Sequence, residues 1–271
     1  MIDGALPYLR CPVCRDGLRR DDRRLLCPRG HSFDMAKQGY ADLTAGRMPH
    51  VGDTAEMIAD REAFLAAGHY DFIAGALPGA DGLVVDAGTG TGFYLARVLD
   101  KTDVQGLGID VSKPALRRAA KIHPRAAAVL ADLWRPLPIA DGAAAMILNV
   151  FAPRNGAEYR RILRPGGVLV VVTPAADHLA ELMRGLIRVD PAKAERVSGS
   201  LGEHFTAGPT TTERRTLRLS AAEARTLIGM TPAARHVPPD AMPEGAVTVT
   251  AAVEITTYTE RSTSSHSAGL S

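Results

Sequence analysis

The chain has 271 residues, of which 46% are hydrophobic and 23% are charged, and its net charge at pH 7 is +2. That length suits one large α/β domain with a small module and excludes two full-sized domains. The composition excludes a wholly disordered chain, a coiled coil and a collagen-like fibre. The sequence has no apolar run of the ~20 residues that a membrane helix needs, and its first residues lack the features of a secretion signal. We therefore expect a cytoplasmic protein with no membrane partner.

The three cysteines lie in the first tenth of the chain and form a metal-ligand motif with a histidine. The spacing is Cys11-x2-Cys14-x12-Cys27-x3-His31. An odd number of cysteines argues against a disulfide framework, whereas three thiolates and one imidazole complete a closed tetrahedral zinc site. A segment of ~30 residues buries too little apolar surface to fold unaided. The pattern therefore predicts a structural zinc module.

The same segment is rich in arginine. Residues 1–31 contain seven arginines and four aspartates. The excess of positive charge has two interpretations: a surface that faces nucleic-acid phosphates, or a solvated face in a protein that uses arginine in place of lysine. The sequence alone leaves both open.

Residues 33–43 are expected to leave the module as a strand, and a polar linker follows to Gly52. Asp53 and Glu56 have the spacing of a capping box, which predicts a helix that starts there and is ended by Gly68. His69 and Tyr70 would then occupy the turn into the main domain.

A glycine-rich turn, Gly88-Thr89-Gly90-Thr91-Gly92, follows a buried strand over 83–87 and precedes a helix expected over 93–99. Such a turn lets the backbone approach a nucleotide-like ligand closely. A dinucleotide fingerprint would need glycine at position 93, and the Lys-Ser/Thr ending of a P-loop is missing. The pattern Asp86-x-Gly88-x-Gly90-x-Gly92 is instead similar to motif I of S-adenosylmethionine (SAM)-dependent methyltransferases.

Further strands follow at the spacing of a doubly wound sheet, over 104–109, 126–130, 143–148 and 168–173. A helix is expected over 113–121 and a turn over 163–167. Asp110 ends the second strand, where a carboxylate can accept both ribose hydroxyl protons of an adenosyl group. Asp132 and Leu133 end the third strand, where such folds usually hold adenine, and Asn149 lies at the end of the fourth. The predicted fold is therefore α/β: a Rossmann-like, doubly wound, mostly parallel methyltransferase sheet preceded by a zinc-binding module.

The C-terminal third is less regular. After Thr173 we expect a helix that reaches about residue 188, and a polar insertion over 190–215 that covers the site. Ser220 and Glu223 form a second capping box for a helix to Ile228. Residues 247–258 alternate like a partly exposed strand, and residues 261–271 are expected to be a disordered tail.

Three further segments accompany the zinc motif and the glycine-rich turn: HSFDMAKQGYADL, GDTAEM with AGHY, and TPAADHL. With them, residues 9 to about 231 resemble the RlmA/TlrB family of 23S rRNA guanine-N1 methyltransferases. The resemblance implies SAM as methyl donor, a structural zinc ion, and methylation of N1 of a guanine in a 23S rRNA hairpin loop. Some members thereby confer macrolide resistance, and members form homodimers.

The resemblance also assigns roles by position. Cys11, Cys14, Cys27 and His31 match the zinc ligands, and Tyr70, the 88–92 loop and His178 match SAM contacts. Thr89 and Thr91 depart from relatives that have a cysteine and an acidic residue, so individual cofactor contacts can differ. The full expected cofactor set is Tyr70, Asp86, Gly88, Gly90, Thr91, Gly92, Asp110, Asp132, Leu133, Asn149 and His178. The expected organisation is a zinc-binding RNA-recognition module (1–45), a linker and helix (46–75), a methyltransferase domain (76–260) and a tail (261–271).

The reaction needs a guanine that has left its stack and is aligned with the sulfonium methyl group. Asn149, Phe151 and His178 are candidates near that methyl group. His178 has three interpretations: a base for the N1 proton, a contact to the SAM carboxylate, or a helix cap. The segment 149–153 only faintly resembles the Asn-Pro-Pro-aromatic motif of exocyclic-amine methyltransferases, so strand-end structure explains it better and no catalytic residue is named.

Two other function classes stay open on the sequence. One is a small-molecule methyltransferase with an accessory zinc module, although such enzymes rarely need an arginine-rich module. The other is a SAM-binding regulator without activity, against which the intact series Asp86, Asp110 and Asp132 argues. Binding to RNA should weaken steeply with salt, whereas turnover of a small molecule should not.

Overall fold

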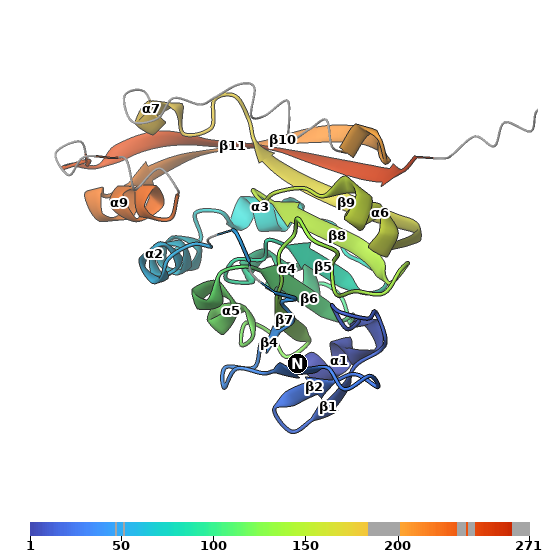
Figure 1. Cartoon of the computed structure of the whole chain (residues 1–271). Helices are drawn as coiled ribbons and strands as arrows, with labels where there is room; N and C mark the ends of the chain where they lie inside the picture. Colours follow the sequence, from blue (N-terminus) through green and yellow to red (C-terminus); the bar gives the residue numbers. More distant parts are fainter. Residues whose placement is uncertain (47, 51, 184–200, 232–236, 238–241, 262–271) are drawn as a thin grey trace, which may run out of the picture.

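One eight-stranded sheet forms the centre of the molecule, with helices on its faces (Figure 1). The computed structural model describes all residues except 47, 51, 184–200, 232–236, 238–241 and 262–271. The strand order is β10-β11-β9-β8-β5-β6-β7-β4. The six strands from β4 to β9 in that order are parallel, and β11 and β10 continue the sheet in antiparallel fashion. The predicted doubly wound, mostly parallel α/β fold is confirmed.

The strands of this sheet are β4 (Ala41–Asp42), β5 (Val84–Ala87), β6 (Gly106–Asp110), β7 (Ala126–Leu130), β8 (Ala144–Val150), β9 (Leu163–Pro174), β10 (Phe205–Leu219) and β11 (Val247–Glu260). The helices are α1 (Ile2–Ala5), the 3-10 turn η1 (Leu6–Tyr8), α2 (Ala55–Ala66), α3 (Asp71–Ala76), α4 (Phe93–Leu99), α5 (Lys113–Ala119), α6 (Gly156–Ile162), α7 (Ala180–Met183) and α9 (Ala221–Gly229). A separate three-stranded sheet holds β1 (Arg19–Asp21), β2 (Arg24–Leu26) and β3 (Ser32–Asp34). No helix in the described part of the chain combines the length and the apolar character that crossing a membrane requires.

Alternate residues of the central strands supply two hydrophobic cores, one on each face of the sheet. Val84 and Leu148 belong to one core, and Val85 and Ile109 to the other. Each fully buried aliphatic side chain contributes about 1.5–3 kcal/mol. The core that contains Val85 also contains Leu25 of the small sheet. The zinc module therefore packs onto the main sheet and shares its core.

Two contacts tie the module to the sheet. The exit strand β4 pairs in parallel with β7, which makes it the edge of the main sheet, a pairing that the sequence did not predict. The guanidinium group of Arg15 donates to the carbonyls of Leu137 and Ile139, at 2.6 and 2.8 Å. These hydrogen bonds satisfy backbone groups that would otherwise need water.

Some sequence predictions of local structure were wrong. Helix α2 is capped by Thr54, whose Oγ1 accepts from the Met57 N–H at 3.3 Å, whereas Asp53 forms an ion pair with Arg61 at 2.7 Å. Threonine is a favoured N-cap residue, so the helix is capped one residue later than predicted. The capping box at Ser220, in contrast, is confirmed.

The expected turn at 163–167 lies inside β9. The ladder to β8 is interrupted there, between the pairs Ala144–Leu163 and Met146–Val168, and Gly166 has φ of 75°. The irregularity therefore lies within a strand rather than in a turn before one, and four residues of β9 (164–167) lie between the two pairs against one residue of β8.

The prediction of a polar insertion over 190–215 was wrong for residues 205–215. Residues 205–215 belong to β10, which forms a long hairpin with β11, and residues 190–200 lie outside the described part of the chain. Strand β10 is exposed along most of its length, so it lacks the buried alternation that identifies a strand in a sequence. The expected tail from 262 on and the helix beyond 183 also lie outside the described residues.

Candidate methyl-transfer site and zinc centre

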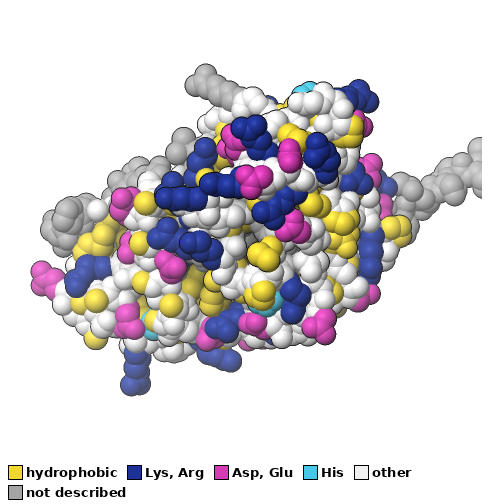
Figure 2. Space-filling view, turned by 90° about the horizontal axis from the view of Figure 1, so that it is seen from below, with side chains coloured by type: hydrophobic (Ala, Val, Ile, Leu, Met, Phe, Trp, Pro, Cys, Tyr) yellow, Lys and Arg dark blue, Asp and Glu magenta, His cyan; other side chains and the backbone are white. Residues whose placement is uncertain are grey.

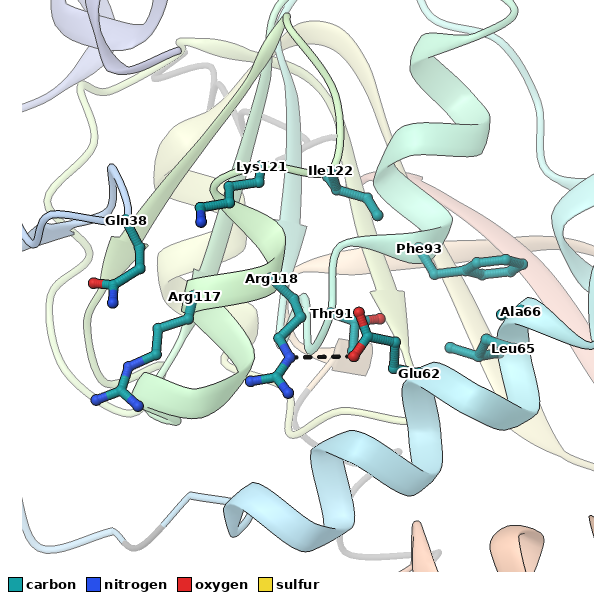
Figure 3. Close-up of a pocket in the computed structure, with 10 residues that line it drawn as sticks. All are labelled: Gln38, Glu62, Leu65, Ala66, Thr91, Phe93, Arg117, Arg118, Lys121 and Ile122. Atoms are coloured by element: carbon teal, nitrogen blue, oxygen red, sulfur yellow. Dashed lines mark hydrogen bonds and ion pairs between the residues drawn. The ribbon is translucent and has the colours of Figure 1, made fainter.

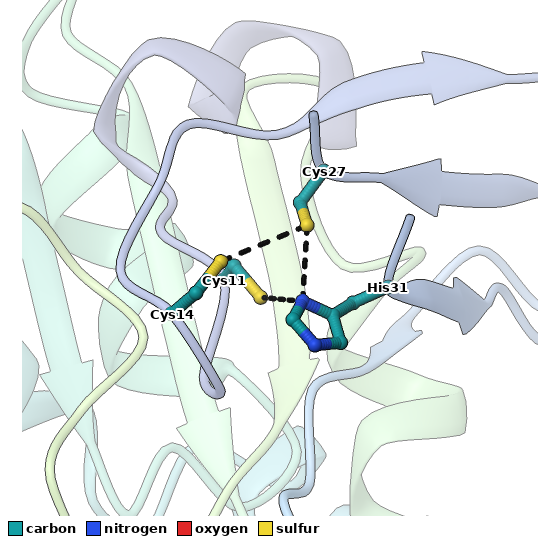
Figure 4. A group of neighbouring side chains, drawn as sticks. All are labelled: Cys11, Cys14, Cys27 and His31. Atoms are coloured by element: carbon teal, nitrogen blue, oxygen red, sulfur yellow. Dashed lines mark hydrogen bonds between the residues drawn. The ribbon is translucent and has the colours of Figure 1, made fainter. Parts of the chain in front are cut away.

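The four predicted zinc ligands lie together between two loops of the small module (Figure 4). Cys11 and Cys14 precede β1, and Cys27 and His31 flank the turn from β2 to β3. Their ligand atoms all lie within 4.8 Å of one another. The sulfur atoms of Cys14 and Cys27 are 3.7 Å apart, and His31 Nδ1 lies 3.1 Å from Cys27 Sγ and 3.5 Å from Cys11 Sγ.

Two of these three separations fit the edges of a tetrahedron around zinc, and the third, from His31 Nδ1 to Cys27 Sγ, is shorter. Bonds of about 2.3 Å to sulfur and about 2.0 Å to nitrogen imply edges of roughly 3.5–3.8 Å. Although desolvation raises the pKa of the Cys27 thiol, hydrogen bonds from the backbone of His31 and Arg29 outweigh it and lower that pKa to about 7. Although a backbone hydrogen bond to Asp16 lowers the pKa of the neighbouring Cys14 thiol, desolvation and the other two cysteines raise that pKa to about 11, so the clustered donor atoms carry the case for the site. The donor set suits Zn²⁺ and fills all four positions, as in a structural site.

Most arginines of the module have partners within the protein. Arg20 pairs with Asp3 at 2.7 Å, and Arg29 with Asp16 at 2.8 Å. Figure 2 shows the underside of the molecule, where Lys and Arg side chains lie among Asp and Glu side chains. The mixture of charges means that the arginines of this segment do not form a patch of a single sign, and both interpretations of the segment stay open.

The glycine-rich turn after β5 forms an open backbone cradle. Gly88, Gly90 and Gly92 have φ of 84°, 55° and 83°, a region that residues with a side chain rarely adopt. A Cβ atom on Gly88 would overlap that of Ala152, which follows β8. The two loops therefore meet where the strand order reverses, between β5 and β8, and doubly wound folds bind ligands at that point.

Carboxylates end the strands on which this cradle rests. The two oxygens of Asp110 accept from the N–H groups of Gly90 and Ser112, each at 2.8 Å, and each oxygen keeps a lone pair for a ligand hydroxyl. Asp86 is buried and accepts from Thr89 Oγ1 at 2.7 Å. Burial, together with the charge of Asp110, raises the pKa of Asp86 to about 7, and burial also raises that of Asp110. The open cradle and the acidic edge fit an adenosyl ligand that carries hydroxyl, amino and sulfonium groups.

Asp132 and Leu133 are buried at the end of β7, where the sequence placed an adenine contact. Asp132 is already engaged on both oxygens: Oδ2 lies 2.8 Å from His50 Nδ1, and Oδ1 accepts from the Trp134 N–H at 3.0 Å. Its carboxylate therefore orders the loop after β7 in the described structure.

Asn149 is fully buried and faces the protein interior. Its amide group donates to the carbonyl oxygen of Pro153 at 2.9 Å and lies 3.2 Å from the hydroxyl of Tyr159. The amide nitrogen thus shapes the loop after β8, whereas Oδ1 has no hydrogen-bond partner in the described structure. Thr91 is buried too, within the cradle itself.

Tyr70 and His178, which the family resemblance assigns to SAM contacts, lie side by side. The Tyr70 hydroxyl is 3.4 Å from His178 Nε2, and His178 Nδ1 is 2.8 Å from the carbonyl oxygen of Ala252. The backbone N–H of Ala252 also lies 3.1 Å from Nδ1 and can donate to it, so these two contacts are compatible with either tautomer of the ring. Burial lowers the pKa of His178, so the ring is neutral near pH 7. A neutral imidazole can accept a proton or a hydrogen bond at the ring nitrogen that carries no proton.

Sequence reasoning missed Arg61, on α2. Its Nη1 atom is the nearest group to the position that a Cβ on Gly90 would occupy, at 3.3 Å. The guanidinium also pairs with Asp53 and donates to the carbonyl of Met230. A cation beside the cradle can hold a ligand carboxylate. In the sequence, Arg61 follows shortly after GDTAEM, one of the segments that carry the family resemblance.

A hollow of about 580 Å³ lies between α2, the start of α4 and α5 (Figure 3). Leu65, Phe93 and Ile122 line one side, and Gln38, Arg117 and Lys121 line the other. Among the described residues no ion pair involves Arg117 or Lys121, and both are exposed. We call this hollow the α2–α5 groove. The groove lies between the segment that leaves the zinc module and the helices of the methyltransferase domain. Its two unpaired basic side chains are available to a ligand.

Two families match parts of the chain. Residues 9–45 match the family described as RlmA, N-terminal, a zinc ribbon, and residues 84–167 match a methyltransferase domain. The first match covers all four clustered ligands, and the second covers the cradle and Asp110.

Similar proteins align over nearly the whole chain. A protein of Micromonospora griseorubida assigned as a 23S rRNA (guanine-N(1)-)-methyltransferase is 53% identical, over 93% of this chain and 97% of its own. The 23S rRNA (guanine(748)-N(1))-methyltransferase of Streptomyces fradiae is 49% identical, over 89% of this chain and 90% of its own. Among solved structures, the YcgJ protein of Bacillus subtilis covers 74% of this chain and 99% of its own, with a TM-score of 0.49 and 16% identity.

Proposed function

The chain belongs to the family of 23S rRNA (guanine-N(1)-)-methyltransferases, and we propose on this premise that its target is the guanine at position 748. The enzyme transfers a methyl group from SAM to N1 of a guanine in 23S rRNA. The observation that carries the specific target is the 49% identity to the Streptomyces fradiae enzyme, which spans both the zinc ribbon and the methyltransferase region. No observation favours a small-molecule substrate or a protein without activity.

When bound, SAM supplies an electrophilic methyl group: the N1–C bond forms as the C–S bond breaks, S-adenosylhomocysteine leaves, and the N1 proton is released. The residues of this chain bind and align the reactants. Asp110 would accept the ribose hydroxyls, and the bare backbone of the 88–92 turn allows a ligand to approach closely. Tyr70 and His178 would orient the methionine end beside Arg61. Alignment of this kind accounts for much of the rate of an in-line displacement.

We also propose that the rRNA hairpin is held by the zinc ribbon together with the α2–α5 groove. Arg117 and Lys121 are free to contact phosphates, whereas most arginines of the ribbon are paired. Each phosphate contact releases counterions and so makes binding depend on salt. A homodimer, a role in macrolide resistance and a cytoplasmic place of action, where 23S rRNA is modified, belong to the same proposal.

The test uses purified protein, SAM and a 23S rRNA fragment that contains the hairpin. A methyl group on guanine N1 blocks Watson–Crick pairing, so reverse transcription should stop next to position 748. A fragment with adenine at that position is the control and should show no stop. A stop at a different guanine would overturn the proposed target, and no incorporation despite measurable SAM binding would overturn the substrate.

The groove is tested separately by the double substitution Arg117→Ala/Lys121→Ala. We expect the slope of log K against log salt to fall by about 1–2 for RNA binding, with unchanged affinity for SAM. Arg218→Ala, an exposed arginine on the opposite edge strand β10, is the matched control. If the control and the double variant have equal slopes, the groove does not contact RNA.

A further inference from the structure

Phe151 has an unusual backbone conformation at the edge of the site. It follows β8 directly and has φ of 55°, although a bulky aromatic residue rarely adopts positive φ. Its N–H donates to the carbonyl of Val172 at 3.1 Å, and the next residue, Ala152, packs against Gly88. The surroundings therefore impose this conformation. Strained residues of this kind cluster at ligand-binding sites.

The Phe151 ring is also unusually exposed. It is 42% exposed, in a chain where most large apolar side chains of the described part are buried. Its centroid lies 6.4 Å from that of Tyr70 and 6.0 Å from that of His178, and the rings are tilted by 45° and 39°. The strained backbone thus presents an aromatic ring to solvent beside two residues assigned to the methyl donor.

A guanine that is methylated on N1 must leave its base stack and give up its base pair. An aromatic side chain at the site can replace the lost stacking. We propose that the Phe151 ring is the surface on which the extruded guanine stacks while its N1 faces the methyl donor. This inference rests on the proposed function and adds the residue that receives the base.

Trp134 is the competing candidate. It is 51% exposed and follows β7, with its ring centroid 6.5 Å from that of His50. Among the described residues the Trp134 ring contacts the His50 ring, and it has no ring contact with Tyr70 or His178. The geometry at the crevice favours Phe151.

The first test compares Phe151→Leu, Phe151→Tyr and Trp134→Leu. Loss of one stacking contact should lower kcat/KM for the RNA by about 5- to 150-fold in Phe151→Leu, with the Kd of SAM changed less than about twofold. Phe151→Tyr keeps a stacking ring and should stay within about threefold of the parent. If Phe151→Leu is as active as the parent, or if Trp134→Leu alone causes the loss, the proposal is overturned.

The second test separates stacking from a structural role by a double-mutant cycle across the interface. RNA affinity is measured in the presence of S-adenosylhomocysteine, with guanine or an abasic site at the target position. If Phe151 stacks on that base, removing the base should weaken binding to the parent protein but not further weaken binding to Phe151→Leu. Additive losses would show that the ring acts elsewhere.

The two proposals fail in different ways. If the parent protein does not methylate the RNA, the proposed function fails. If the parent methylates it and Phe151→Leu does so equally well, only the stacking role fails.

Discussion

Of the three cradle glycines, Gly88 is the one on which an added Cβ would come closest to another atom. The substitution Gly88→Ala therefore has a well-defined expected effect. At φ of 84° an alanine costs about 1–2 kcal/mol from its backbone alone. The new Cβ would also overlap that of Ala152, and overpacking of this kind costs about 1–3 kcal/mol more. We therefore expect the free energy of unfolding in urea to fall by about 2–5 kcal/mol. Because the two loops must move apart at the crevice, the Kd of SAM should rise at least about tenfold.

Two variants isolate the steric part of this effect. Gly166→Ala has a similar φ of 75° and no atom within 4 Å of the new Cβ beyond its chain neighbours, so it should cost only the backbone share, about 1–2 kcal/mol, without affecting SAM. In Gly88→Ala/Ala152→Gly the overlapping atom is gone, and SAM affinity should largely return. The reasoning is refuted if Gly88→Ala behaves like Gly166→Ala, or if the second substitution rescues nothing.

Three further outcomes follow from the same geometry. Removing zinc by chelation, or by Cys14→Ser, should lower the melting temperature of the whole chain by about 5–10 °C, because the ribbon shares its core with the sheet. An unchanged melting temperature in a sample that metal analysis shows to be free of zinc would contradict this. Folding raises the pKa of Asp86 from 3.8 to about 7, so between these pH values the folded chain binds a proton that the unfolded chain has lost. The free energy of unfolding should therefore fall by up to about 1.4 kcal/mol per pH unit as pH rises through this range. Denaturation of Asp86→Asn at several pH values should show that this decline is lost. Asp110→Asn leaves one acceptor oxygen and no charge for the ribose, so calorimetry should show SAM binding weakened about 10- to 100-fold, and an unchanged Kd would exclude the contact.

The zinc cluster and the cradle could be predicted from the sequence because short spacing determines them. Cys11 and Cys14 are three positions apart, and the three glycines alternate within five residues, so local backbone geometry already brings their groups together. Even helix α4 and strand β7 have the expected bounds. The parallel sheet followed because buried strands and helices alternate at regular distances.

The remaining features depend on contacts between distant parts of the chain. His50 meets Asp132 across 82 positions, and β4 becomes a sheet edge by pairing with β7. Strand β10 owes its conformation to its ladder with β11 rather than to a buried face, so its polar sequence resembled an insertion. The positive φ of Phe151 likewise arises from the way its loop packs against Gly88, which no local pattern reveals.

The surroundings of Asn149 likewise depend on contacts that its position in the sequence does not give. Its position at the end of β8 predicts a ligand contact, which stays a prediction. Asn149 points inward to Pro153 and Tyr159, and the next residues carry the exposed ring. Residues two positions apart in a strand face the same way, so it is the positive φ of Phe151 that turns its ring to a different environment.

The central claim is the identity of the methylated atom, and nucleoside mass spectrometry tests it most directly. The 23S rRNA fragment is incubated with the protein and SAM, digested to nucleosides and compared with standards for each methylated guanosine. The account predicts 1-methylguanosine, formed once per fragment and absent when the guanine at position 748 is replaced. Methylation at N2, N7 or O6, or on a ribose, would contradict it.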